Sequence, residues 1–253
     1  MEGYMLSKIE IKLSSDKEIS YNMSSIFHGA LMEHIDKDYC NYLHSCELNP
    51  YSQYLTKKEN VWYWVINTLN SEAYKKIIEE CILKLDNIYL SKKNTNIIFS
   101  SKYLTTINKK SLIDNFYEKK YDKYVELDFR TTTTFKKNGE YIIYPDIRCI
   151  YQSLMRKYDF SSMDQSMFGE ETLEHLCEFT KIVQYNLKSS VFHLEGVKIP
   201  GFIGKIKLKI SGTKTITSFA NMLFDFGAYS GIGAKTSLGM GSMMKLERKA
   251  FYE

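Results

Sequence analysis

The chain is 253 residues long, with 44% hydrophobic and 25% charged residues, a composition that predicts a folded globular protein of one or two domains. Its five cysteines are scattered without a C-x-x-C pair, which argues against a zinc site or a disulfide framework and fits a reducing cytoplasm. The chain shows no leader-like start and no apolar run near the ~20 residues that span a bilayer, so we expect neither a signal peptide nor a membrane anchor.

The net charge of +4 is distributed unevenly along the chain. Between Gly196 and Lys249, nine lysine and arginine residues outnumber two acids, Asp225 and Glu247, whereas the rest of the chain is slightly acidic. A basic segment of this kind suits a polyanionic partner, and a solvated lysine-rich face is the alternative.

The spacing of apolar residues divides the first half of the chain into strands and helices. The run KIEIKL alternates with the period of a half-buried strand, whereas VWYWVI is apolar throughout, as in a buried strand. The expected elements in chain order are a strand over Lys8–Leu13, helices over Ser24–His34 and Lys37–Cys46, a strand over Val61–Ile66, a helix over Glu72–Leu85, and strands over Asn87–Lys92 and Ile97–Ile107.

The second half repeats this pattern. An Asn138-Gly139 turn predicts a hairpin, and Pro145 is well placed to open a helix. The expected elements are strands over Tyr124–Lys136 and Tyr141–Tyr144, helices over Pro145–Lys157 and Glu170–Phe179, strands over Val183–Leu194 and Phe202–Ile210, a helix over Thr215–Phe226, and a last strand over Leu238–Leu246.

Both halves approximate the order β-α-β-β-α-β, which is typical of a ferredoxin-like unit. We therefore predict an α+β protein of two tandem ferredoxin-like (RRM-like) domains, residues 1–120 and 121–253. The boundary is expected at the charged stretch Glu118–Lys123.

Five glycines crowd into the stretch Phe226–Met243 together with Lys235, Thr236 and Ser237. Glycine lets backbone N–H groups approach an anion closely, and a nearby lysine adds charge, so the stretch predicts a phosphate-binding loop. The spacing excludes a nucleotide P-loop, because Ala234 precedes the lysine, and it also departs from a dinucleotide fingerprint. A glycine-rich turn before the last strand is the structural alternative.

The loop resembles the G-x-G-x-K-x-S-x-G-x-G signature of the CRISPR-associated repeat-processing endoribonucleases, members of the RAMP superfamily. The matching positions are Gly231, Gly233, Lys235, Ser237, Gly239 and Gly241. Weaker similarities in YPDIRCIYQSL, KIPGFIG, HGAL and YLH extend the resemblance over nearly the whole chain, most closely to members of type III-A systems.

The resemblance implies two ferredoxin-like folds, binding of CRISPR repeat RNA, and cleavage of precursor CRISPR RNA without a metal ion or another cofactor. Attack by the RNA's own 2′-hydroxyl would leave 2′,3′-cyclic phosphate and 5′-hydroxyl ends. A non-catalytic RNA-binding subunit of a CRISPR effector complex is the alternative. Transient association with a type III effector complex and a homodimer both stay open.

Such a reaction needs a base, an acid and a cation, and histidine titrates near neutrality. Of the five histidines, His44 best matches the family's catalytic position, and His28 is the second candidate. His34, His175 and His193 are expected to be structural or surface residues. No pair of histidines has the H-E-x-x-H spacing of a metal site.

The family's accompanying tyrosine and lysine have no obvious match here. Met32 stands near the tyrosine position, and Asn49-Pro50-Tyr51 stands where the lysine is expected. We therefore name Lys57 as the candidate cation, with Lys58 beside it and with Tyr51 and Tyr54 as further groups near the site.

The run F-I-G-K-I-K-L-K-I predicts a strand with one basic face. Lys205, Lys207 and Lys209 alternate with Ile206, Leu208 and Ile210, so the lysines share a face. We expect these lysines to bind the RNA backbone together with the glycine-rich loop, namely Gly231, Gly233, Lys235, Thr236, Ser237, Gly239 and Gly241.

Overall fold

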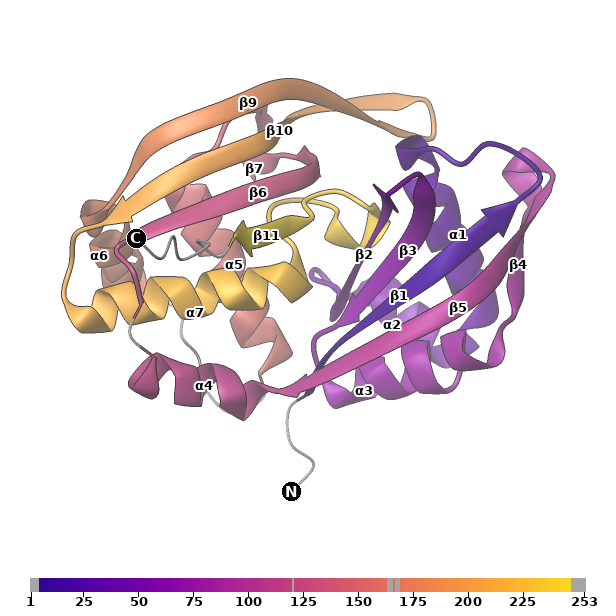
Figure 1. The fold of residues 1–253 in the computed structure, drawn as a ribbon, viewed down its shortest axis with the longest axis horizontal. Coiled ribbons are helices and arrows are strands. Elements are labelled where there is room, and N and C mark those ends of the chain that lie inside the picture. Colours follow the sequence, from indigo (N-terminus) through magenta and orange to yellow (C-terminus); the bar gives the residue numbers. More distant parts are fainter. Residues whose placement is uncertain (1–4, 120, 163–165, 167–168, 247–253) are drawn as a thin grey trace.

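The computed structural model describes residues 5–119, 121–162, 166 and 169–246, and its main feature is two antiparallel sheets, each backed by helices (Figure 1). The five-stranded sheet has the order β2-β3-β1-β5-β4, and the four-stranded sheet has the order β11-β6-β10-β9. The two sheets lie side by side, and the mixed α+β class with antiparallel sheets is confirmed.

The first sheet is formed by the N-terminal half. Alternating apolar side chains on β1, such as Ile9 and Ile11, pack with Trp64 of β3 and Phe27 of α1 in one core. The elements are β1 (Met5–Ser15), α1 (Ser24–His34), α2 (Lys37–Ser45), β2 (Tyr51–Lys58), β3 (Val61–Thr68), α3 (Ser71–Ala73) with the helical turns that follow it, β4 (Asn87–Leu90) and β5 (Thr95–Asn108).

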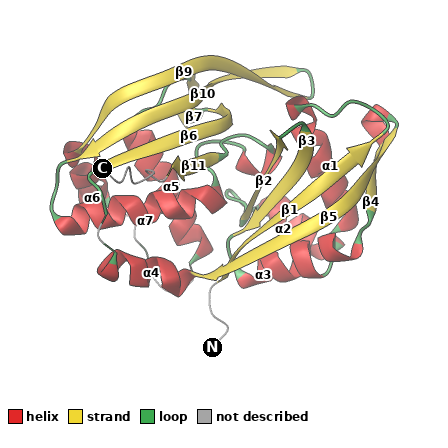
Figure 2. Cartoon of the chain, in the orientation of Figure 1, coloured by secondary structure: helices red, strands yellow, loops and turns green. Residues whose placement is uncertain are grey.

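The second sheet is formed by the C-terminal half, and helices α5 and α7 cover one of its faces (Figure 2). A small hairpin, β7–β8, forms a separate two-stranded sheet, and Phe135 of β7 packs on Phe202 of β10. The elements are α4 (Lys109–Glu118), β6 (Tyr124–Thr133), β7 (Phe135–Lys137), β8 (Glu140–Ile142), α5 (Ile147–Ser161), α6 (Glu170–Phe179), β9 (Thr180–Leu194), β10 (Val197–Ile210), α7 (Lys214–Ser230) and β11 (Met243–Leu246).

Strand order and direction in both sheets agree with a ferredoxin-like unit. In each, the first strand lies between the third and the last, and all neighbours are antiparallel, with β4 as an extra edge strand in the first sheet. The exact domain boundary stays a prediction, and residue 120 lies outside the described residues. Leu112 of α4 packs with Met222 and Phe226 of α7, so α4 is attached to the C-terminal helices.

The structure differs from the sequence-based elements at several places. Helix α4 has no counterpart among the expected elements, and the strand expected over Tyr124–Lys136 is divided into β6 and β7. Strand β2 was not predicted, because its Ser52 and Gln53 are polar although both are buried. The helix expected over Glu72–Leu85 is divided into short turns. The last strand begins only at Met243, because a short 3₁₀ turn over Thr236–Leu238 precedes it.

The buried polar residues of β2 are explained by hydrogen bonds, two of which reach the C-terminal half. Ser52 Oγ donates to the carbonyl of Tyr229 at 2.6 Å. Gln53 Nε2 donates to the carbonyls of Ser24 and Ser237, both at 3.0 Å, while Gln53 Oε1 accepts from Trp64 Nε1 at 2.8 Å. Buried amides are tolerated only when they are hydrogen-bonded, so these contacts fix where the glycine-rich loop meets β2.

Gly239 also brings the glycine-rich loop close to helix α1. It has φ +109°, and a Cβ there would lie 2.2 Å from the Cβ of Ser24, at the start of α1. Gly139, in the β7–β8 turn, has φ +85° but open space around it.

We expect Gly239→Ala to lower the free energy of unfolding clearly more than Gly139→Ala does. Both changes impose the positive-φ penalty of about 1–2 kcal/mol, but only Gly239→Ala also forces the loop away from α1. Urea denaturation of both variants measures the difference, and equal midpoints would show that the loop does not press on α1.

Candidate active site

His28 and His44 line one cavity of about 340 Å³, although they come from different helices. His28 lies in the middle of α1 and is partly buried, whereas His44 lies at the C-terminal end of α2 and is exposed. Leu238 of the glycine-rich loop closes the same cavity from the C-terminal half. The two histidines singled out by the sequence are therefore neighbours in the structure.

His28 is held by contacts within the protein. Its Nδ1 lies 2.9 Å from the hydroxyl of Tyr51 on β2, and the ring also hydrogen-bonds the backbone of Ser237. Burial, with a smaller contribution from nearby His44, lowers the pKa of His28 to about 4. The imidazole of His28 is therefore neutral at neutral pH.

Tyr51 is fully buried, and burial raises the pKa of its phenol well above the usual range. It is therefore a neutral hydrogen-bonding partner of His28. Tyr54, the other tyrosine considered from the sequence, is also buried and lines none of the walls of the histidine cavity. His44 is thus the side chain of this group that a large ligand can reach.

Lys57 does not join the histidines. It lies on β2 and lines a different cavity of about 670 Å³, together with Lys58 and with Arg130, Lys188 and Lys205 of the second sheet. Its ammonium lies 5.9 Å from the centre of the Trp62 ring. The structure therefore groups Lys57 with basic residues of the junction between the sheets, apart from His28 and His44.

The glycine-rich loop is folded against the end of β6 by its own backbone. The N–H groups of Ile232, Gly233, Ala234 and Gly241 donate to Gly241 O, Ser153 Oγ, Thr134 O and Thr132 O respectively, at 2.8–3.0 Å. This differs from the sequence-based expectation, because these N–H groups are engaged within the protein. The positive φ of Gly231, Gly233 and Gly241 serves the close packing of the loop.

Lys157 of α5 anchors the glycine-rich loop by hydrogen bonds. The sequence-based predictions did not include this residue. Its buried ammonium donates to the carbonyls of Ser230 and Gly231 and to Thr236 Oγ1, at 3.1–3.4 Å. Burial lowers its pKa to about 7. A signal was available, because a lysine at position 157 interrupts the apolar stripe that Ile150 and Leu154 begin.

Lys235 is the loop's own cation, in a left-handed conformation with φ +59°. It lines a cavity of about 480 Å³ together with Lys136 and Arg156, and this cavity shares Leu238 with the histidine cavity. Asn49 Nδ2 lies 3.4 Å from Ser237 Oγ in the wall of this cavity.

The alternation predicted for β10 is present. Ile206, Leu208 and Ile210 are buried against the helices, and Lys205, Lys207 and Lys209 lie on the opposite face. Two acids of β6 share that face, because Asp128 lies opposite Lys205 and Glu126 opposite Lys207. The acids partly offset the lysines, and the Lys205–Glu126 ion pair measures 3.7 Å.

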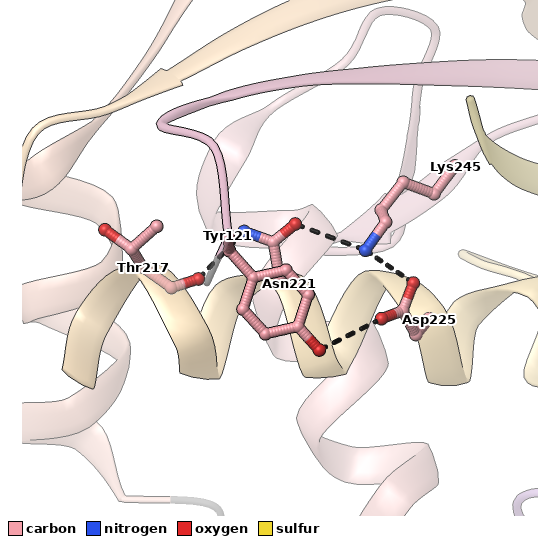
Figure 3. Close-up of polar contacts among 5 residues, drawn as sticks. All are labelled: Tyr121, Thr217, Asn221, Asp225 and Lys245. Atoms are coloured by element: carbon pink, nitrogen blue, oxygen red, sulfur yellow. Dashed lines mark hydrogen bonds and ion pairs between the residues drawn. The ribbon is translucent and has the colours of Figure 1, made fainter. Parts of the chain in front are cut away.

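Another lysine of the basic C-terminal segment is used internally (Figure 3). Lys245 Nζ lies 2.6 Å from Asp225 Oδ1 and 3.2 Å from Asn221 Oδ1, and it stands over the ring of Tyr121. Asn221 is itself bound to the carbonyl of Thr217. This network ties β11 to α7, so Lys245 is not part of the basic surface.

The remaining histidines lie apart from the cavity. His34, His175 and His193 are exposed, and His34 Nδ1 is bonded to the carbonyl of Ala30. Within the described ranges, no group of three or more His, Cys, Asp or Glu side chains is arranged to hold a metal ion. No helix in the described part of the chain is long and apolar enough to cross a membrane.

Comparison with solved structures agrees with the fold. A Cas6 product complex superposes with a TM-score of 0.79 at 19% identity, covering 96% of this chain and all of that chain. A Thermus thermophilus Cas6 structure gives a TM-score of 0.72 at 18% identity, over 96% of this chain and 99% of that one. A RAMP protein gives 0.58 at 13% identity, with 95% and 100% coverage.

Comparison of sequences points to the same group. The family model for the CRISPR-associated endoribonuclease Cas6 matches residues 127–243. A Cas6 from Mycobacterium tuberculosis is 29% identical over 94% of this chain and 77% of that protein. A Cas6 from Streptococcus thermophilus is 35% identical over 88% of this chain and 91% of that protein. At this identity over nearly the full length of both proteins, the chain belongs to the Cas6 family of CRISPR-associated endoribonucleases.

Proposed function

We propose that this chain binds CRISPR repeat RNA and cuts precursor CRISPR RNA, with the 2′-hydroxyl beside the cut as nucleophile and no metal ion in the reaction. The observation that carries the proposal is the shared cavity of His28 and His44, closed by the loop that bears the family signature. The RNA supplies the nucleophile, so the protein has only to move protons and stabilise charge.

His44 is the proton-transfer group in this proposal. Its side chain is exposed in the cavity, so it can approach the 2′-hydroxyl or the leaving 5′-oxygen. His28 is neutral, engaged with Tyr51 and Ser237, and belongs to the contact between α1, β2 and the loop. We therefore assign His28 the task of keeping the cavity in shape beside His44.

The RNA backbone is proposed to run over basic residues from both halves. Lys57, Lys58, Arg130, Lys188 and Lys205 gather around one cavity at the junction of the two sheets. Lys207 and Lys209 continue this surface along β10, and Lys235 of the loop lines a separate cavity with Lys136 and Arg156. Lysine and arginine that replace counterions along the phosphates supply most of the sequence-independent affinity.

The nature of the product ends tests the chemistry. We expect cleavage of a labelled cognate repeat RNA in EDTA to give 2′,3′-cyclic phosphate and 5′-hydroxyl ends, because the 2′-oxygen attacks the adjacent phosphorus. A 2′-deoxy nucleotide at the cut should block the reaction. Strict dependence on Mg²⁺ or a 5′-phosphate product would contradict the mechanism, and tight binding without any cutting would favour a non-catalytic RNA-binding subunit.

Substitution of the two histidines separates cutting from binding. We expect His44→Ala to slow single-turnover cleavage on the order of 10²–10⁴-fold, as for loss of an acid–base group, with little change in RNA affinity. The matched variant His28→Ala is expected to slow cleavage less than His44→Ala does, because it disturbs the shape of the cavity and removes no proton-transfer group. If His28→Ala abolishes cutting while His44→Ala cuts normally, the two roles are exchanged.

The charges on β10 are tested by salt dependence. Replacing Lys205, Lys207 and Lys209 together by alanine should weaken RNA binding and reduce the slope of log K against log salt, because fewer counterions are released. Because Glu126 and Asp128 partly neutralise these lysines, the decrease in slope should be smaller than the decrease expected for the loss of three phosphate contacts. Lys75→Ala, on the exposed helical side of the first sheet, is the control, and an unchanged slope in the triple variant would exclude this face.

A further inference from the structure

The proposed reaction calls for a cation beside the histidine cavity, and Lys57, the candidate named from the sequence, lines a different cavity. In a 2′-hydroxyl attack, negative charge gathers on the non-bridging oxygens of the phosphorane, and a positive side chain within reach stabilises it. Lys57 and Lys58 line another cavity, and Lys235 lines a third. None of these three lysines lines the cavity of His28 and His44.

Lys92 is the one lysine or arginine among the described residues that line this cavity. It belongs to the short turn Ser91–Lys93 between β4 and β5, about fifty residues beyond His44 in the sequence. The turn is braced, because Lys17 Nζ donates to the carbonyls of Lys93 and Asn94, and Asn94 has φ +47°. Lys92 is therefore presented from a fixed backbone.

The ammonium of Lys92 is aimed toward the C-terminal half by an ion pair. Its Nζ lies 3.0 Å from Glu195 Oε1, in the turn that joins β9 to β10, and Glu195 lines the same cavity. Both side chains are mostly exposed, at 66% and 71%. Pairs this exposed contribute little stability, so an RNA phosphate can displace the carboxylate without a large loss.

We propose that Lys92 is a catalytic residue of this chain, the cation that contacts the non-bridging oxygens of the phosphate being cut. The inference rests on the proposed ribonuclease function and names a residue that the family resemblance did not assign. In the step, the 2′-oxygen forms a bond to phosphorus as its proton leaves to a base, and the bond to the 5′-oxygen breaks as that oxygen takes a proton. Lys92 stays protonated throughout and only stabilises charge.

The experiment compares Lys92→Ala, Lys92→Arg and Lys93→Ala in the full chain, with wild type and His44→Ala alongside, on cognate repeat RNA in EDTA. Lys93 is a matched control, because it is the adjacent lysine of the same turn and does not line the cavity. Single-turnover rates at saturating RNA are measured together with the affinity for 2′-deoxy RNA. We expect Lys92→Ala to cut 10- to 100-fold more slowly with its affinity changed less than threefold, Lys92→Arg to recover most of the rate, and Lys93→Ala to match wild type.

The outcomes separate this inference from the proposed function. If wild type cuts and Lys92→Ala cuts equally fast, or if Lys93→Ala is slowed to the same extent, Lys92 is not the cation. If wild type does not cut at all, the ribonuclease function fails and Lys92 fails with it. Glu195→Gln adds an independent arm: it should cut at least as fast as wild type, and loss of cutting in Glu195→Gln with normal cutting in Lys92→Ala would transfer the role to the carboxylate.

Discussion

The contact between the segment Thr236–Leu238 and strand β2 is the constraint on which the candidate site depends. Ser237 accepts a bond from Gln53 through its carbonyl, contacts Asn49 through its hydroxyl and contacts His28 through its backbone. One residue of the C-terminal half therefore fixes both the edge of the first sheet and the orientation of a histidine. Without this contact, the cavity that His28, His44 and Leu238 share would have no wall on that side.

The same contact explains why polar side chains are buried at positions where apolar side chains would cost less free energy to bury. A buried amide or ammonium costs several kcal/mol unless its hydrogen bonds are satisfied. Gln53 bonds three partners from three different elements, and Lys157 bonds three oxygens of the loop and of the C-terminal end of α7. Such groups satisfy their bonds in only one arrangement, so they specify a single position of the loop.

Periodicity predicted most of the fold, and it failed where tertiary contacts override it. The alternation of β1 and β10 and the capped helix α5 follow from spacing, since one face of each element meets a core. Strand β2 could not be predicted, because Ser52 and Gln53 are buried against residues almost two hundred positions away. The candidate histidines came from the family resemblance, whereas Lys157 and the proposed Lys92 were not predicted, because their partners lie on elements distant in sequence.

The basic charge of the chain is divided between its two halves. The basic excess of the C-terminal segment is reduced by the Lys245–Asp225 pair and by the acids opposite Lys205 and Lys207. The cavity at the junction compensates for this loss, because it adds Lys57 and Lys58 from β2 to the cations of the second sheet. The histidine cavity is likewise assembled from α1 and α2 on one side and from Leu238 and Glu195 on the other. The contact of the loop with β2 thus joins the two halves where both cavities lie, and the proposed binding and cutting of RNA depend on it.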